Sequence, residues 1–135
     1  PSPNLENPIA LDAREPLWVV EQPDFELAAP ITAIVNINMI HIAPWSACLG
    51  LLAGAKRILP GDGILYLYGP YKQGGQHTAP SNAAFDESLR QQNPEWGVRD
   101  LETVITAATE QGFSLVKTVA MPANNLSVIF QKQAQ

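Results

Sequence analysis

The sequence lacks several features that would assign the chain to a large class of proteins. Its single cysteine, Cys48, excludes an intrachain disulfide, and no Cys/His spacing typical of a structural zinc site is present. No apolar run in the sequence reaches the roughly 20 residues of a membrane-spanning helix. The first residues have neither the charge nor the apolar segment of a secretion signal. We therefore expect a cytoplasmic protein with no metal of its own and no membrane partner.

Two further absences concern ligands. The sequence contains no glycine-rich nucleotide loop, the segment whose backbone lets a nucleotide approach closely in many α/β proteins. Basic residues are also few, because 8 Lys and Arg stand against 13 Asp and Glu for a formal net charge of −5. This charge is opposite in sign to that of proteins that bind the nucleic-acid backbone, so we expect no nucleic-acid partner.

The 135 residues are typical of a single domain with a core of its own. Apolar segments predict strands at 8–12, 31–37, 64–68, 114–120 and 126–131. Helical spacing predicts helices at 44–58, in a short segment around 85–89, and between the N-cap Asp100 and Gly112. Residues 69–81 have no apolar period, so we expect a long, mobile surface loop there.

The order of these elements predicts an α/β fold. A helix between the strands 31–37 and 64–68 is typical of parallel pairing. The five residues between the last two strands instead favour an antiparallel pair, because a parallel return needs a crossover. We therefore expect a mostly parallel sheet with a C-terminal antiparallel hairpin.

A candidate ligand site follows the strand 31–37, where an apolar run passes into a polar turn edged by an aromatic residue. Ligands of open α/β sheets bind just beyond the carboxyl ends of the strands, and the residues at this point are Asn36, Asn38, His41 and Trp45. The ordinary pKa of histidine suits a general base near neutrality. The alternative is that His41 only forms a hydrogen bond at a strand end.

Aromatic residues are candidates for contacts with a substrate. An aromatic wall can surround a cationic or flat molecule, and the residues available for it are Trp45, Tyr68, Tyr71 and Trp96. Each of them can instead belong to the core. We therefore name them as possible substrate contacts beside the candidate crevice.

Charged residues form a second candidate group. Asp86 and Arg90 lie four residues apart, a spacing typical of an exposed ion pair on a helix. Arg90, Asn93 and Arg99 nevertheless concentrate polar chemistry in a chain with only 16% charged residues. An arginine pair here can clamp a carboxylate or phosphate of a substrate.

The motifs resemble a known group of enzymes. The strings RILPGDGIL (57–65) and NMIH (38–41) resemble segments in the carboxyl-terminal half of class I S-adenosylmethionine-dependent methyltransferases. The strings NINMIHIAPW (36–45), NPEWGVRD (93–100) and MPANN (121–125) resemble the methyltransferase-like protein 26 family more narrowly. The resemblance begins near Ile9 and implies a truncated, Rossmann-like methyltransferase sheet.

The resemblance also implies which residues contact the cofactor. It places Asp12 and Ala13 beside the adenine, with Asp12 accepting a hydrogen bond from the amino group. It places Asn36, Asn38 and Met39 along the methionine side. The glycine-rich loop and the acid that holds the ribose lie before this segment in the family. We therefore expect S-adenosylmethionine to bind the full-length protein and to bind this chain alone weakly or not at all.

Two classes of function follow. The first is a methyltransferase acting on a small molecule, to which this chain contributes the substrate side and part of the adenosine pocket. The second is a non-catalytic binding or assembly module. In either case the strand 31–37 is left at an apolar edge of the sheet, and such edges invite pairing with another chain. We therefore expect either a homo-oligomer joined through this edge or an amino-terminal segment that folds back beside it.

Overall fold

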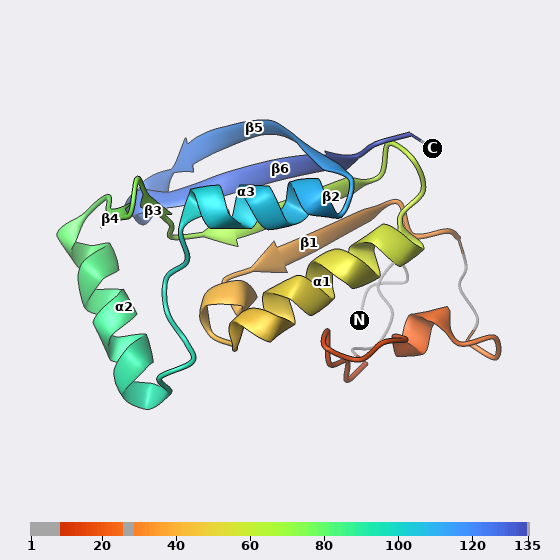
Figure 1. Cartoon of the computed structure of the whole chain (residues 1–135), viewed down its shortest axis with the longest axis horizontal. Coiled ribbons are helices and arrows are strands. Elements are labelled where there is room, and N and C mark those ends of the chain that lie inside the picture. Colours follow the sequence, from red (N-terminus) through yellow and green to blue (C-terminus); the bar gives the residue numbers. More distant parts are fainter. Residues whose placement is uncertain (1–8, 26–28, 135) are drawn as a thin grey trace.

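The computed structural model describes residues 9–25 and 29–134. Its main sheet has the strand order β1-β2-β6-β5 (Figure 1). The strands are β1 (Ala33–Ile37), β2 (Ile64–Gly69), β5 (Phe113–Met121) and β6 (Asn125–Lys132). The predicted segments 31–37, 64–68, 114–120 and 126–131 all lie within or next to these strands, and the predicted C-terminal hairpin is confirmed as the antiparallel pair of β5 and β6.

The expectation of a mostly parallel sheet was wrong. β1 and β2 are parallel, but β2 pairs with β6, and β6 with β5, in antiparallel fashion. A parallel neighbour requires a helical crossover. Within the described residues the chain makes one such crossover between adjacent strands of this sheet, through the helix α1 (Trp45–Ile58).

The prediction of a strand at 8–12 was also wrong for residues 9–12, which the structure describes. Residues 9–12 form no strand, and Pro8 lies outside the described residues. In the described part of the chain, the neighbour of β1 in the sheet is β2. A strand needs a neighbour for its backbone hydrogen bonds, and an apolar pattern alone does not supply one.

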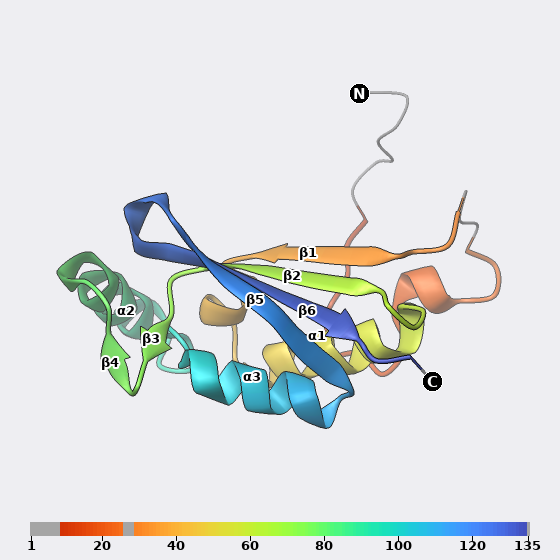
Figure 2. The same cartoon turned by 90° about the horizontal axis from the view of Figure 1, so that it is seen from above.

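Two helices cover one face of the sheet. The helices α1 and α3 (Leu101–Glu110) lie on the same side (Figure 2), and Leu65 and Leu67 of β2 are buried beneath them at 0% and 1% exposure. The turn after α3 depends on Gly112, whose φ of +85° is a left-handed value that glycine adopts without strain. The helices predicted at 44–58 and 101–111 are therefore confirmed.

The segment 69–81 is more ordered than predicted. It contains a small hairpin of β3 (Lys72–Gln73) and β4 (Gln76–His77). Gly74 and Gly75 form its turn at φ +62° and +77°. Its strands are only two residues long, so they are too short to produce an apolar period in the sequence. The helix around 85–89 is not short either, since α2 spans Pro80–Gln92.

The opposite face of the sheet carries exposed apolar side chains. Val35 and Ile37 of β1 are 64% and 62% exposed. Both alternate with Ile34 and Asn36, which point toward the helices, as expected for the two-residue period of a strand. No helix in the part of the chain that the structure describes is both long enough and apolar enough to cross a membrane.

Candidate functional site

β1 ends in a sharp turn that brings polar side chains together. Asn38 follows the strand with φ +62°, a left-handed conformation that asparagine tolerates better than most residues. Its backbone N–H donates to the carbonyl oxygen of Tyr68 at 2.8 Å, which extends the pairing with β2. The 3₁₀ turn η2 (Met39–His41) follows directly. The sequence prediction of a strand that passes into a polar turn is therefore confirmed.

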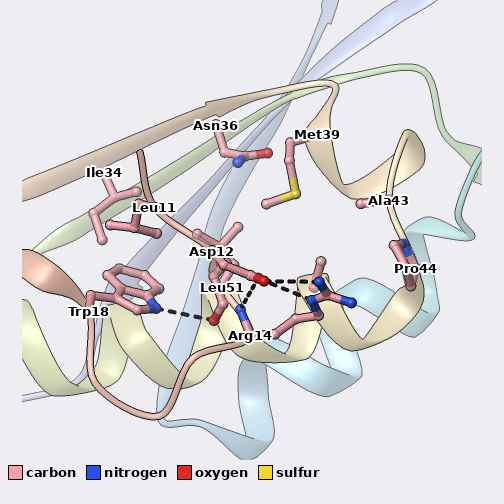
Figure 3. Close-up of a pocket in the computed structure, with 12 residues that line it drawn as sticks. Leu11, Asp12, Arg14, Trp18, Ile34, Asn36, Met39, Ala43, Pro44 and Leu51 are labelled. Atoms are coloured by element: carbon pink, nitrogen blue, oxygen red, sulfur yellow. Dashed lines mark hydrogen bonds and ion pairs between the residues drawn. The ribbon is translucent and has the colours of Figure 1, made fainter. Parts of the chain in front are cut away.

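A pocket of about 530 Å³ lies beside the carboxyl end of β1 (Figure 3). We call it the β1 pocket; β1, η2, α1 and the segment 11–18 form its walls. Four residues of the predicted cofactor site line it, whereas the fifth, Asn38, does not. The lining residues include Leu11, Asp12, Ala13, Trp18, Ile34, Asn36, Met39 and Leu51.

Two glycines of α1 position the wall formed by residues 11–18. A β-carbon on Gly54 would overlap the indole of Trp18, and one on Gly50 would overlap the carbonyl of Ala13. The indole Nε1–H of Trp18 donates to that same carbonyl at 3.1 Å. Sequence reasoning missed this anchor, although the spacing of the glycines at one helical turn was visible as a possible signal.

An ion pair fixes the same wall from outside. The guanidinium of Arg57 lies 5.7 Å from the centre of the Trp18 ring and forms a 2.9 Å ion pair with Glu21. Hydrogen bonds from Arg57 hold the pKa of the Glu21 carboxyl below its usual value. The loop before β1 is thereby tied to α1.

Asp12 faces the pocket as a charged hydrogen-bond acceptor. Its carboxylate accepts hydrogen bonds from the backbone N–H, Nε and Nη2 of Arg14 at 3.0, 3.1 and 2.9 Å, and these lower the pKa of Asp12. On the opposite wall, Asn36 and Met39 reach into the same space (Figure 3). The Oδ1 atom of Asn36 is buried and has no hydrogen-bond partner among the described residues. The pocket therefore offers acceptors from both sides.

His41 ends the 3₁₀ turn η2 and is fully buried. Its Nδ1 accepts a hydrogen bond from the backbone N–H of Arg99 at 3.1 Å. Burial, followed by the nearby charge of Arg99, lowers the pKa of His41 to about 3. The imidazole is therefore neutral near pH 7 with its proton on Nε2. This tautomer favours a hydrogen-bond donor over the general base named from the sequence.

Arg99 is occupied by the protein itself. Its guanidinium donates to the carbonyl oxygens of Ile40, Ala43 and Glu95 at 2.9, 2.6 and 2.9 Å, and it lies 5.6 Å from the ring centre of Trp45. Arg99 thereby joins the segment after α2 to the turn after β1. Trp45 stacks on this cation and is not among the residues that line the β1 pocket.

Asp86 and Arg90 form the helical pair that their spacing predicts, but Asp86 is buried. Asp86 is 6% exposed, and its Oδ1 accepts from Nε of Arg90 at 3.1 Å and from the backbone N–H of Val98 at 2.8 Å. Nε2 of His77 lies 3.3 Å from Oδ2. Arg90 and Arg99 thus both have partners within the protein, and their use as a clamp on a substrate stays a prediction.

The remaining predicted contacts include Tyr71, Asn93 and Trp96. Tyr71 is 1% exposed and packs edge-on against His41, with 4.9 Å between the ring centres. Asn93 accepts the backbone N–H of Glu95 at 2.9 Å, and the half-buried Trp96 follows in the same turn. The contact of these residues with a substrate stays a prediction.

A second pocket, of about 320 Å³, lies beyond the ends of β1 and β2. We call it the asparagine pocket. It is enclosed by α2, by the turn after β2 and by the 3₁₀ turn η3 (Pro122–Asn124) between β5 and β6. The nearby hydroxyl of Tyr68 accepts from Nδ2 of Asn125 at 3.3 Å. The lining residues are Asn38, Pro70, Ser81, Asn82, Phe85, Ala123, Asn124 and Asn125.

Sequence reasoning missed the asparagine pocket because it interpreted residues 121–125 as the connection of an antiparallel pair and as part of a family resemblance, without assigning them a site. A signal existed in the four asparagines of three separate segments, Asn38, Asn82 and Asn124–Asn125. Three lining residues, Asn38, Ala123 and Asn124, have positive φ values between 61° and 62°. Such conformations concentrate at functional turns.

The comparisons with known proteins agree with this architecture. A family model described as "Protein of unknown function (DUF938)" matches residues 1–132. Human N-acetylserotonin methyltransferase in complex with S-adenosylmethionine superposes with a TM-score of 0.69 at 13% identity, over 84% of this chain and 33% of that one.

Two further solved structures share the fold. An O-methyltransferase family 2 protein from Planctomyces limnophilus, in complex with apigenin, has a TM-score of 0.69 at 21% identity over 77% of this chain and 31% of that one. The methyltransferase CalO1 of calicheamicin biosynthesis, in its S-adenosylhomocysteine-bound form, has a TM-score of 0.64 at 14% identity, with 79% and 31% covered. The chain thus spans about a third of these structures and shares the class I methyltransferase fold with that part.

Proposed function

The chain belongs to the DUF938 family, and we propose that it is part of an S-adenosylmethionine-dependent methyltransferase that acts on a small molecule. The observation that carries the proposal is the β1 pocket. It brings Asp12, Ala13, Asn36 and Met39 together at the carboxyl end of β1, where open α/β sheets bind their ligands. The shared fold with methyltransferases bound to the cofactor or its product supports this assignment.

The residues of the β1 pocket fit the cofactor chemically. The Asp12 carboxylate can accept the adenine amino group, with Ala13 beside the ring. The unpartnered Oδ1 of Asn36 and the thioether of Met39 face the methionine side. When bound, S-adenosylmethionine supplies an electrophilic methyl group on a sulfonium. Asn38 belongs to the neighbouring pocket and lies on the route toward the acceptor.

The chain's own residues orient the reactants. Methyl transfer depends strongly on holding donor and acceptor in line, a positioning effect. Arg99, Gly54 and Trp18 serve this role indirectly because they fix the two turns that form the pocket. His41 contributes a neutral Nε2–H donor at the end of β1.

A titration with S-adenosylhomocysteine tests the proposal. We expect the amide resonances of Asp12, Ala13 and Asn36 in the ¹⁵N-labelled chain to shift with saturation. The variant Asp12→Ala removes the acceptor, whereas Asp24→Ala removes an exposed acid that does not line the pocket. Shifts scattered over the surface, or equal effects of the two variants, would refute the cofactor role.

A second candidate function is a non-catalytic assembly module. β1 is the last strand at its edge of the described sheet, and its Val35 and Ile37 are exposed. We propose that a second copy of the chain pairs with this edge, because two identical edge strands can pair antiparallel about a twofold axis. This assembly is compatible with the methyltransferase proposal as well.

A further inference from the structure

The asparagine pocket has a defined place relative to the β1 pocket. Asn36 lines the β1 pocket and Asn38, two residues later, lines the asparagine pocket. The two pockets thus flank the end of one strand. If the β1 pocket holds the methyl donor, the asparagine pocket is the adjacent space from which an acceptor can approach it.

The lining of the asparagine pocket carries no ionisable side chain. A carboxylate or phosphate in such a pocket would lack the cationic partner that makes its burial favourable. The arginines nearest in the sequence are engaged, since Arg90 bonds to Asp86 and Arg99 bonds to three backbone carbonyls. The net charge of −5 opposes an anionic ligand too. A neutral ligand therefore fits this pocket best.

A donor and an acceptor without partners flank Gly69, the residue before Pro70 of the pocket lining. Oδ1 of Asn38 and Nε2 of His41 lie 2.8 and 3.0 Å from the point where a β-carbon on Gly69 would stand. Both atoms are buried, and neither has a hydrogen-bond partner among the described residues. Nε2 carries a proton, because Nδ1 accepts from Arg99. A hydroxyl or a primary amide suits the asparagine side chains that line the pocket, since each of these groups can donate and accept.

The rest of the pocket is built in advance. Asn82 is 4% exposed, and its Nδ2 donates to Oγ1 of Thr78 at 3.2 Å and to the carbonyl of Asn124 at 3.1 Å. These bonds join α2 to the turn η3 and fix the opening between them. Phe85 and Pro70 supply apolar surface for a ring. Small-molecule sites commonly combine apolar walls with a few fixed polar groups.

We propose that the asparagine pocket binds the methyl acceptor, and that the acceptor is a neutral small molecule with a hydroxyl or amide group. This inference rests on the proposed methyltransferase function. Asn38 binds and orients the polar group, with the buried His41 beside it, while Phe85 packs against the apolar part.

The test uses three probes that share one ring: phenol, benzamide and benzoate. Each is titrated into the ¹⁵N-labelled chain while the resonances of Asn38, Asn82 and Asn124 are followed. Phenol or benzamide is expected to shift them with saturation, and benzoate is expected to bind at least about fivefold more weakly for lack of a cationic partner. Equal or tighter binding of benzoate, or shifts outside the pocket, would overturn the proposal.

Asn38→Gly is the key variant, because glycine keeps the left-handed backbone and removes the amide. Its matched control is Asp62→Gly, which makes the same kind of change at φ +67° at the other end of β2. Asn38→Gly is expected to weaken binding of the neutral probes about fivefold or more, as for one lost hydrogen bond. The control is expected to leave their binding unchanged. If Asn38→Gly does not fold, Phe85→Leu takes its place with the same criterion.

The outcomes separate this inference from the proposed function. Saturable shifts of the β1 pocket by S-adenosylhomocysteine, with no response of the asparagine pocket to phenol or benzamide, overturn the acceptor site alone. Selective binding of the neutral probes without binding of S-adenosylhomocysteine overturns the cofactor role of the β1 pocket and, with it, the acceptor role of the asparagine pocket.

Discussion

The backbone N–H of Arg99 donates a 3.1 Å hydrogen bond to Nδ1 of His41, and this contact decides how the histidine can act. The two residues are 58 positions apart in the sequence. A neutral imidazole that accepts at Nδ1 must hold its proton at Nε2. The atom that faces Gly69 and Asn38 is therefore a donor.

We predict that His41 does not titrate between pH 5 and 8, because burial lowers its pKa from 6.5 to about 3. In the unfolded chain, His41 becomes protonated once the pH falls below the ordinary pKa of histidine. In the folded chain it stays neutral down to about pH 3. The free energy of unfolding therefore falls as the pH is lowered from about 6.5 to 3, by at most about 1.4 kcal/mol per pH unit. Imidazole ¹⁵N shifts and urea unfolding across this range measure both effects.

His41→Gln is expected to flatten this dependence, and His77→Gln, which changes the other histidine, is expected to retain it. Comparison of the two removes the contribution of the carboxylates, which also lose stabilising contacts in acid. An imidazole signal of His41 that moves with an apparent pKa near 6.5 would contradict the assigned tautomer and burial.

We predict strong coupling between Gly54 and Trp18, because a β-carbon at position 54 would overlap the indole. Alanine is intrinsically better than glycine in a helix by up to about 1 kcal/mol. Gly54→Ala should therefore stabilise the chain in a Trp18→Ala background but displace the indole and reduce stability in the wild type. A double-mutant cycle with thermal unfolding, together with the Trp18 indole N–H resonance, measures the coupling. Additive effects would show that the indole does not lie on Gly54.

We predict that the two arginines of the expected clamp differ in their effect on stability. Arg99→Ala removes a half-buried cation from three carbonyls and should lower the free energy of unfolding by at least about 2 kcal/mol. Arg90→Ala changes a mostly exposed partner of Asp86 and should cost less than about 1 kcal/mol. Chemical unfolding of both variants provides the comparison, and an equal small effect would contradict a structural role of Arg99.

We predict that the chain alone binds S-adenosylmethionine no tighter than the millimolar range, about −4 kcal/mol. Its β1 pocket supplies acceptors for the adenine and methionine parts, whereas the sequence contains no glycine-rich loop. Isothermal titration calorimetry measures this limit. Micromolar binding would mean that the described residues hold the cofactor without such a loop.

We predict a homodimer joined at the β1 edge. Ile37→Lys places a charge on an exposed residue of this strand and is expected to produce monomers in sedimentation velocity with unchanged circular dichroism. Val116→Lys, on the exposed strand β5 at the other edge, serves as the control and should remain dimeric. A monomeric wild type would exclude the assembly.

The local parts of the fold could be predicted from the sequence because each depends on neighbouring residues. The apolar stripe of α1, the run 64–68 and the turn at Gly112 all indicate their own conformation. The pairing of β2 with β6 could not be predicted, since it joins residues more than 50 positions apart. The apolar run 9–12 led to a wrong strand prediction for the same reason. A strand needs a partner strand, and the run itself does not show whether one is available.

The candidate site divides in the same way. The pattern of Asn36, Asn38 and Met39 at a strand end was visible in the sequence, and the structure places these residues beside the two pockets. The engagement of Arg99 by backbone carbonyls, and the seating of Trp18 on Gly54, depend on contacts between distant segments. Residue types alone do not reveal whether a cation is available to a ligand.

The alignment of β1 with β2, in which Asn36 stands opposite Leu67, links folding fidelity to chemistry. Side chains alternate between the faces of a strand, so a slip by a single residue would exchange the two faces. Ile37 would then enter the β1 pocket while Asn36 turned to the outer surface. Such a misaligned protein could keep its strands and helices and pass a spectroscopic test of folding, yet neither pocket would retain its polar end.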